Sequence, residues 1–131
     1  GIEYAGQDVS DEYVRRTIYT LLNMGAKSVV LKGIVRAGEP VIRNYVAVAK
    51  GDGAPEEISS ELLPYMLHGT GDLFASGLTA AIYTGRSLYE AVEFAGKLVR
   101  DAMTITPDQP DYQVRGVSFE SVLGNVTELL R

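Results

Sequence analysis

Apolar residues recur in the first third of the chain at the spacing of a helix and then in the continuous runs of strands. Four of them mark one face of a helix: Val14, Ile18, Leu21 and Leu22. Ser10 is placed to cap this helix, and Gly25 is placed to end it. Residues 28–34 and 41–49 are rich in β-branched residues, and a turn-forming stretch at residues 36–40 separates them. The pattern predicts a helix followed by an antiparallel hairpin.

After the hairpin, the pattern predicts a loop at residues 51–55, a short edge strand at residues 56–60 and a helix that begins near Thr70. Pro64 disfavours a long helix before His68, because proline lacks the backbone N–H that a helix needs. The apolar face of the Thr70 helix has five members: Leu73, Phe74, Leu78, Ala81 and Ile82. Small residues beside that face allow a close approach to a neighbouring element.

Two further helices bring the expected total to about four. Ser87 and Glu90 fit a capping box, which predicts a helix that continues to about residue 102. Residues 106–116 are rich in Pro, Asp and Gln and predict a loop. Ser118 is placed to cap a last helix with four apolar positions: Val122, Leu123, Val126 and Leu130.

The order of elements predicts an α/β fold, and residues 1–131 are expected to form one domain. The formal net charge of −5 argues against a nucleic acid or an anionic membrane as the main partner. No apolar run has the length of a membrane span. Zero cysteines and one histidine exclude disulfides, thiolate sites and multi-histidine metal sites, so no metal ligand is assigned. With no secretory pattern, we expect a cytoplasmic protein, and the start at Gly1 suggests processing or a fragment.

The residues best suited to a chemical role stand where a loop ends and a helix begins: Gly69, Thr70, Gly71 and Asp72. The first N–H groups of a helix lack intrahelical partners and carry its positive dipole end, so such a place binds phosphate oxygens. A carboxylate beside a bound phosphate suits one task, which is to accept a proton from an attacking hydroxyl. A tight turn followed by an aspartate in the first helical turn is also an ordinary helix start, so both alternatives stand at this point.

Other candidates are weaker. Lys32 and Gly33 lie near the end of the first predicted strand, where α/β folds bind ligands. A lysine there suits contact with a nucleotide phosphate or simply with solvent.

Residues 65–67 are apolar and fit either a pocket for a base or ordinary packing. A spacing of four residues that imitates a hydrolase triad links His68, Asp72 and Ser76. However, His68 precedes the helix and Ser76 lies one turn inside it. We reject that alternative.

The sequence Gly-Thr-Gly-Asp-Leu-Phe-Ala-Ser at residues 69–76 resembles the signature of the ribokinase-like superfamily, most of all its pyridoxal kinase branch. The similarity extends over most of the chain, from the helix and hairpin of residues 10–49 to the last helix. It implies a three-layer α/β sandwich of which this chain is the C-terminal, ATP-site half. His68 before the signature also resembles hydroxymethylpyrimidine kinases, but those usually carry cysteine at the position of Asp72.

The resemblance implies ATP-dependent phosphorylation of the hydroxymethyl group of pyridoxal, pyridoxine or pyridoxamine, which forms pyridoxal 5′-phosphate from pyridoxal. By this resemblance Asp72 is the general base, and Lys32 and Gly33 approach the ATP phosphates. Three residues supply the anion hole for the transferred phosphoryl group: Gly69, Thr70 and Gly71. Magnesium accompanies ATP, and the full-length parent is expected to be a homodimer.

Members of that family are longer, and their N-terminal half holds most of the acceptor pocket. The acceptor pocket is therefore expected to lie largely outside this chain, and the chain alone is expected to be inactive or nearly so. Three alternatives remain open from the sequence. They are a kinase of the same superfamily for hydroxymethylpyrimidine or a sugar, a non-catalytic nucleotide-binding module, and a purely structural α/β domain.

Overall fold

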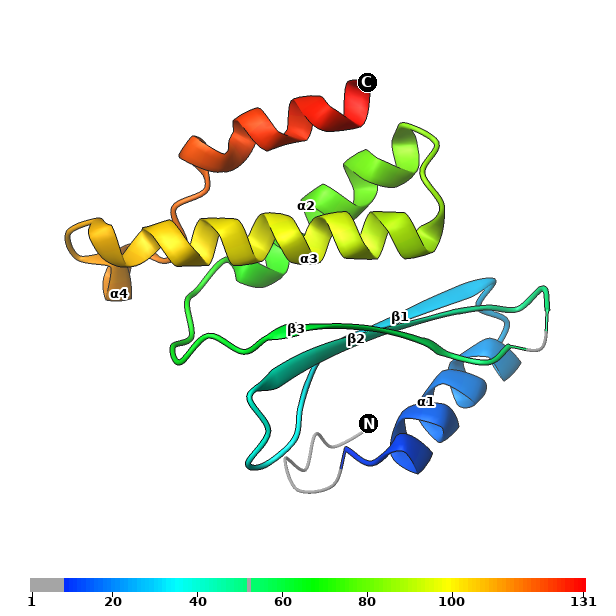
Figure 1. Cartoon of the computed structure of the whole chain (residues 1–131). Helices are drawn as coiled ribbons and strands as arrows, with labels where there is room; N and C mark the ends of the chain where they lie inside the picture. The colour runs from blue at the N-terminus through cyan, green and yellow to red at the C-terminus, as the bar shows by residue number, and fades with distance from the viewer. Residues whose placement is uncertain (1–8, 52) are drawn as a thin grey trace. The chain divides into compact units, whose positions relative to one another are not determined.

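The computed structural model describes residues 9–51 and 53–131, and the chain divides into two compact units, residues 1–62 and 63–131. Unit 1 holds one helix and three strands: α1 (Asp11–Asn23), β1 (Ser28–Val35), β2 (Val41–Val48) and β3 (Glu56–Glu61) (Figure 1). Unit 2 is helical: α2 (Thr70–Tyr83), α3 (Leu88–Ile105), η1 (Thr106–Asp108), α4 (Tyr112–Arg115) and η2 (Glu120–Leu130). The predicted α/β class is confirmed. The single domain over residues 1–131 stays a prediction.

Helix α1 begins where the sequence predicts. The Ser10 hydroxyl accepts the backbone N–H of Tyr13 at 3.2 Å, which satisfies one of the unpaired donors of the first turn. Asp11 and Glu12 follow, where carboxylates are stabilised by the positive end of the helix dipole. Beyond the last turn, Gly25 has a φ of +104°, a conformation that ends the helix.

The sheet has the strand order β1-β2-β3, and both neighbouring pairs are antiparallel. Val30 pairs with Val46 in the predicted hairpin, and Ile42 pairs with Ser60 across to β3. The predicted hairpin and the predicted edge strand are therefore both confirmed. Asp52, within the predicted loop between β2 and β3, lies outside the described residues.

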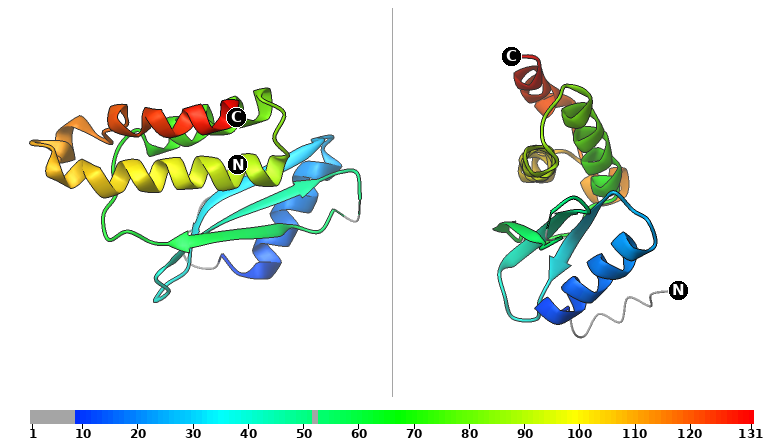
Figure 2. Two further views of the ribbon diagram at one scale, coloured as in Figure 1. Left: turned by 45° about the horizontal axis from the view of Figure 1, so that its top comes forward. Right: turned by 90° about the vertical axis from the view of Figure 1, so that its right-hand side faces the viewer.

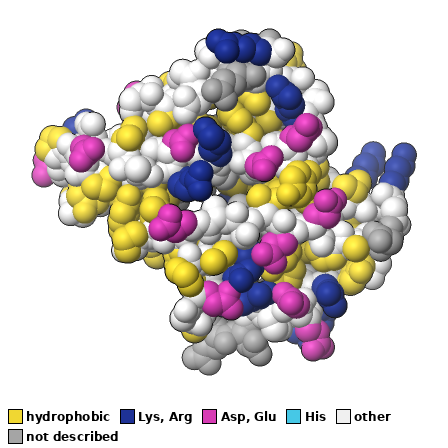
Figure 3. Space-filling model, viewed as in Figure 1, with side chains coloured by type: hydrophobic (Ala, Val, Ile, Leu, Met, Phe, Trp, Pro, Cys, Tyr) yellow, Lys and Arg dark blue, Asp and Glu magenta, His cyan; other side chains and the backbone are white. Residues whose placement is uncertain are grey.

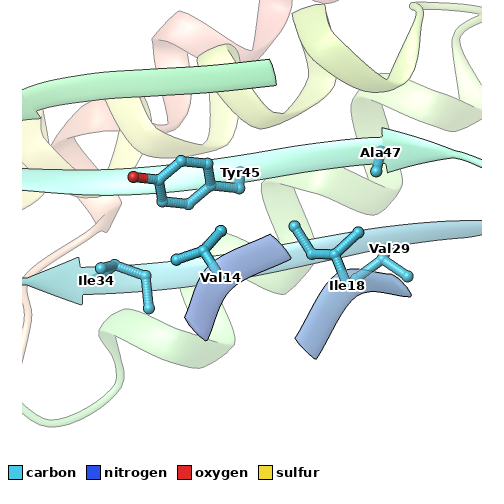
Figure 4. Close-up of a cluster of buried hydrophobic side chains, with 6 residues drawn as sticks. All are labelled: Val14, Ile18, Val29, Ile34, Tyr45 and Ala47. Carbon is cyan, nitrogen blue, oxygen red and sulfur yellow. The ribbon is translucent and has the colours of Figure 1, made fainter. Parts of the chain in front are cut away.

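The core of unit 1 lies between α1 and one face of β1 and β2 (Figure 4). It has six buried members: Val14, Ile18, Val29, Ile34, Tyr45 and Ala47. Val14 and Ile18 point from α1 toward the strands, and Ile18 is 0% exposed. Full burial of such a side chain contributes roughly 1.5–3 kcal/mol, so the apolar stripe of α1 is what fixes the helix on the sheet.

In unit 2, α2, α3 and η2 pack against one another (Figure 2). The predicted capping box starts α3, because Ser87 Oγ accepts the Glu90 N–H and Glu90 Oε2 accepts the Ser87 N–H at 2.8 Å. Gly77 of α2 is buried, and a Cβ there would lie 3.0 Å from Leu98 Cδ2 of α3. The small residues of α2 thus allow close packing between two helices.

Two apolar positions predicted to be buried are exposed. Ile82 of α2 is 47% exposed, because α3 packs on the side of Gly77 and Ala81, about 100° around the helix from it. Leu123 of η2 is 46% exposed, because its neighbour Val122 takes the position in the core. The side chain of Leu130, also predicted on that face, lies outside the description.

The connection after α3 also differs from the prediction. Residues 106–116 were expected to be a loop, but they contain η1 and α4, and a proline in the first turn of η1 suits a helix start. The last helix begins at Glu120 rather than directly after Ser118, and it is a 3₁₀ helix. The reason is that the Ser118 N–H donates to Thr106 Oγ1 at 2.9 Å, which holds Ser118 in the connection.

Charged side chains of both signs are mixed over the face of the molecule in Figure 3. No helix within residues 9–51 and 53–131 combines the length and the apolar composition of a membrane span.

Candidate functional site

Helix α2 begins differently from α1 and α3. Its N-cap is Gly69, with a φ of +87° and no side chain that could accept a hydrogen bond. The first intrahelical bond runs from the Leu73 N–H to the Gly69 carbonyl at 3.0 Å. Serine hydroxyls cap α1 and α3, whereas the first N–H groups of α2 have no side-chain cap. An anion at this helix start would meet donors without a side-chain cap and the positive end of the dipole.

The four predicted residues therefore lie together at one helix start in unit 2. The Thr70 hydroxyl donates to the Leu67 carbonyl at 3.2 Å, so it shapes the turn. Gly71 is half-buried, and Asp72 is exposed in the first helical turn. An exposed carboxylate beside uncapped N–H groups can accept a proton from a hydroxyl that approaches a bound phosphate.

The segment before the turn does not form one apolar surface. The Tyr65 hydroxyl donates to the Met103 carbonyl at 2.7 Å, which fastens the segment to the end of α3. Met66 is 97% exposed, and Leu67 is half-buried. Tyr65 therefore has a structural contact, and the predicted pocket for a base remains a prediction.

Lys32 and Gly33 lie in unit 1, inside β1 rather than at its end. Leu31 pairs with Tyr45 and Ile34 pairs with Arg43, so Lys32 and Gly33 together face the single residue between those partners. This is a β-bulge, and the positive φ of Gly33, +74°, suits its geometry. The predicted strand ended one residue early, which placed the pair closer to the strand end than it is.

The bulge is held by a side chain. Asn44, the residue opposite the bulge, accepts the Gly33 N–H with its Oδ1 at 2.9 Å. The extra residue also shifts the alternation of β1, so that Ile34 joins Val29 on the buried face. The sequence contained one signal for this feature, a glycine inside a β-branched run.

A cluster of polar side chains in unit 1 links parts of the fold to one another. Arg36 Nη2 donates to Asp11 Oδ1 at 2.6 Å and to the Tyr45 hydroxyl, which in turn donates to Glu57. Burial and the hydrogen bond to Glu57 raise the pKa of Tyr45. The cluster joins α1 and the residue after β1 to β2 and β3, so no catalytic role is assigned to it.

Sequence reasoning missed the segment that supports the candidate site. The backbone of residues 116–118 lies against the turn, and the Val117 N–H donates to the His68 carbonyl at 2.9 Å. Gly116, at the end of a polar connection, was the available signal, because a glycine there permits a backbone path closed to other residues.

Comparison with known proteins identifies the family. The family model described as phosphomethylpyrimidine kinase matches residues 5–115. The chain belongs to this family. A hydroxymethylpyrimidine/phosphomethylpyrimidine kinase of Bacillus subtilis (strain 168) is 34% identical to it over 90 residues, which are 66% of this chain and 31% of that protein. The chain thus spans about a third of the length of this curated relative.

Solved structures of the same fold agree with the family. A Bacteroides thetaiotaomicron protein described as a candidate phosphomethylpyrimidine kinase, solved with pyridoxal, has a TM-score of 0.80 and 25% identity, over 92% of this chain and 42% of that one. The pyridoxal kinase of Bacillus subtilis, solved with ADP, has a TM-score of 0.71 and 19% identity, over 88% of this chain and 44% of that one. The family's ribokinase-like fold is therefore the fold of this chain.

Proposed function

We propose that the whole protein is an ATP-dependent kinase that phosphorylates the hydroxymethyl group of a nitrogen heterocycle. The observation that carries this proposal is the uncapped start of α2, with Gly69 to Asp72, in a member of the phosphomethylpyrimidine kinase family. The ligands of the two solved relatives, pyridoxal and ADP, support the substrate classes. The chain spans only part of the length of its relatives, and its proposed contribution to the reaction is phosphate binding and proton acceptance.

In this proposal the N–H groups at the start of α2 hold the oxygens of the phosphoryl group that is transferred. Asp72 accepts the proton of the acceptor hydroxyl, and the hydroxyl oxygen attacks the γ-phosphorus. The bond between that phosphorus and the leaving oxygen breaks, and ADP departs. The donors at the helix start stabilise the charge of the transferred group, while Asp72 raises the nucleophilicity of the attacking oxygen.

Three further residues have assigned places in the proposal. Lys32 and Gly33 of the bulge contact the ATP phosphates, and Asn44 holds the bulge in shape. Magnesium reaches the site with ATP and neutralises phosphate charge when bound. The described ranges contain no group of three or more His, Asp or Glu side chains that could hold a metal, so no described residue is assigned as its ligand.

Pyridoxal, pyridoxine or pyridoxamine is the proposed acceptor, and hydroxymethylpyrimidine is the alternative. Asp72 at the signature supports the first, whereas the curated Bacillus subtilis relative supports the second. Both acceptors present a primary alcohol on an aromatic nitrogen ring, so the chemistry at Asp72 is the same. Turnover of the whole protein with each alcohol, and with a sugar as a third acceptor, decides between them. We also propose a homodimer, which sedimentation of the whole protein would test.

The substitution Asp72→Asn tests the proposed base. It keeps the size of the side chain but removes its basicity, so we expect kcat to fall by about 10²–10⁴-fold while ATP still binds. Turnover and ATP affinity of the whole protein are the measurements. Glu93→Gln, an exposed carboxylate on α3, is the control and should keep full turnover. Unchanged turnover in Asp72→Asn would remove Asp72 from the mechanism.

The same measurements separate the proposal from a non-catalytic module. ATP binding without transfer to any of the three acceptors would support a nucleotide-binding protein. The absence of both binding and transfer would support a purely structural domain.

A further inference from the structure

Gly116, between α4 and η2, has a backbone conformation that almost only glycine adopts. Its φ is +82° and its ψ is −163°. In this region a Cβ atom clashes with the residue's own backbone, at a cost on the order of 1–3 kcal/mol. Gly116 is also buried, so the strain of a larger residue has little room to relax.

A side chain at Gly116 would also strike the turn before α2. A Cβ there would lie 2.7 Å from the carbonyl oxygen of His68, and that oxygen is backbone, so it cannot swing aside. The contact is therefore tighter than real Cβ atoms show, and the backbone of the turn would have to move. The missing side chain of Gly116 is what allows the two backbone segments to approach.

The next residue fastens the same two segments. The Val117 N–H donates to the His68 carbonyl at 2.9 Å. Val117 Cγ1 also lies 3.4 Å from the position that a Cβ would take at Gly69. Residues 116–118, which we call the support segment, thus hold the turn through one hydrogen bond at His68, and the Val117 side chain lies where it would meet a side chain at Gly69.

The support segment is itself fixed to the end of α3. Thr106 is 0% exposed, and its hydroxyl donates to the Ala102 carbonyl at 2.6 Å. The same hydroxyl accepts the Ser118 N–H at 2.9 Å. One buried hydroxyl therefore connects α3 to the support segment, and both of its hydrogen bonds are made away from water, where loss of a partner is costly.

We propose that the support segment positions the phosphate-binding turn, and that Gly116 is a positioning residue for phosphoryl transfer. Since Gly69 has no side chain with which to cap α2, the hydroxyl cap of α1 and α3 is missing there, and the Thr70 hydroxyl supports the turn only through the Leu67 carbonyl. The support segment adds a hydrogen bond at His68 from Val117, 49 residues further along the chain. This inference rests on the proposed function, because a kinase needs the donors and Asp72 in one fixed geometry.

The substitution Gly116→Ala tests the inference in the whole protein. Moving the turn displaces the phosphate donors and Asp72 together, so we expect the KM for ATP to rise and kcat/KM for ATP to fall by about 100-fold, the effect of a displacement near 1 Å. The KM for the acceptor should stay near its wild-type value. A purely structural role would reduce the amount of folded enzyme without changing the KM for ATP.

Gly85→Ala is the matched control. Gly85 follows α2 with a φ of +90°, so alanine there also carries a backbone cost, but no atom lies within 4 Å of its Cβ position. We expect Gly85→Ala to lower the melting temperature while the KM for ATP stays unchanged. Equal effects of the two substitutions on the KM for ATP would overturn the positioning role.

Thr106 gives a second test that does not depend on the clash. Thr106→Val keeps the shape but removes both hydrogen bonds, so it should raise the KM for ATP in the same direction as Gly116→Ala. Thr106→Ser keeps the hydroxyl and should restore the wild-type value. A wild-type KM for ATP in Thr106→Val would contradict the inference.

Amide hydrogen exchange separates failure of this inference from failure of the proposed function. The hydrogen-bonded amides of Leu73 and Val117, which donate to the carbonyls of Gly69 and His68, should exchange faster in Gly116→Ala and Thr106→Val than in the two controls, whether or not the protein transfers phosphate. If the wild-type protein transfers none, the kinase proposal fails, and exchange alone decides the support role. Unchanged exchange in both test variants would overturn that role.

Discussion

At the scale of single residues, the starts of α1, α2 and α3 differ in whether a side chain caps the first N–H groups of the helix. Ser10 and Ser87 satisfy the donors of their helices with their own hydroxyls. Gly69 leaves the donors of α2 without a side-chain cap. A cap at such a position is worth about 1 kcal/mol, so α2 forgoes a common stabilisation at the place where we propose that a phosphate binds.

Glu90 provides a pH-dependent test of the capping box. The hydrogen bonds from the Ser87 hydroxyl and the Ser87 N–H lower the pKa of Glu90. A carboxyl with a lowered pKa stabilises the fold above the ordinary glutamate value of about 4.3, and this contribution is lost as the pH falls through the lowered pKa. Wild type should therefore be more stable than Glu90→Gln at pH 7, and the difference should shrink at pH 3. Thermal unfolding at both pH values measures it.

The same substitution in a Ser87→Ala background is the control. Without the hydroxyl partner, Glu90→Gln should have a smaller effect at pH 7. An equal effect in both backgrounds would mean that the capping box is not the source of the stabilisation.

At the scale of elements, close packing of α2 on α3 depends on one small residue. A Cβ at Gly77 would lie 3.0 Å from Leu98 Cδ2 and 3.5 Å from Ala95 Cα. The first atom is the end of a flexible side chain, whereas the second belongs to the backbone. Alanine can therefore be accommodated by movement of Leu98, but a larger side chain cannot.

The substitution Gly77→Leu tests this packing. Overfilling a helix interface costs typically about 1–3 kcal/mol, so the free energy of unfolding should fall by that amount. Urea denaturation is the measurement. Ser76→Leu, at an exposed neighbouring position of α2, is the matched control and should change stability by no more than about 0.5 kcal/mol. A similar loss in both variants would show that the interface is not the cause.

At the scale of the whole molecule, each unit has a hydrophobic core of its own. The core of unit 1 is held by α1 and two strands, and the clusters of unit 2 are built from α2, α3 and η2. A substitution in one core should therefore first increase the rate of amide hydrogen exchange in the unit that contains it.

The substitution Ile18→Ala applies this to unit 1. Removal of a fully buried isoleucine side chain should lower the free energy of unfolding by about 2–5 kcal/mol. Hydrogen exchange should report the loss first in β1 and β2, against which Ile18 packs. Met24→Ala, at a position 78% exposed, should have almost no effect. Protection of β1 and β2 that is equal in both variants would contradict the assigned core.

Most elements were predictable from the sequence because their signals are local. Ser10 and Ser87 lie within four residues of the groups that they cap, and Gly69 to Asp72 are contiguous. The bulge was missed because it depends on Asn44, eleven residues beyond Gly33. The roles of Asp72 and of the anion hole follow from the resemblance and remain proposals.

The sequence by itself determined the order of the elements as far as α3, the caps of α1 and α3 and the turn at residues 69–72, because each depends on neighbours along the chain. Only the tertiary structure decided which apolar residues stay exposed, as at Ile82, and what supports the turn. The contact of Gly116 and Val117 with His68 joins residues 48 and 49 positions apart. Periodicity describes one element at a time, whereas such a contact exists only after α3 and the connection that follows it have packed.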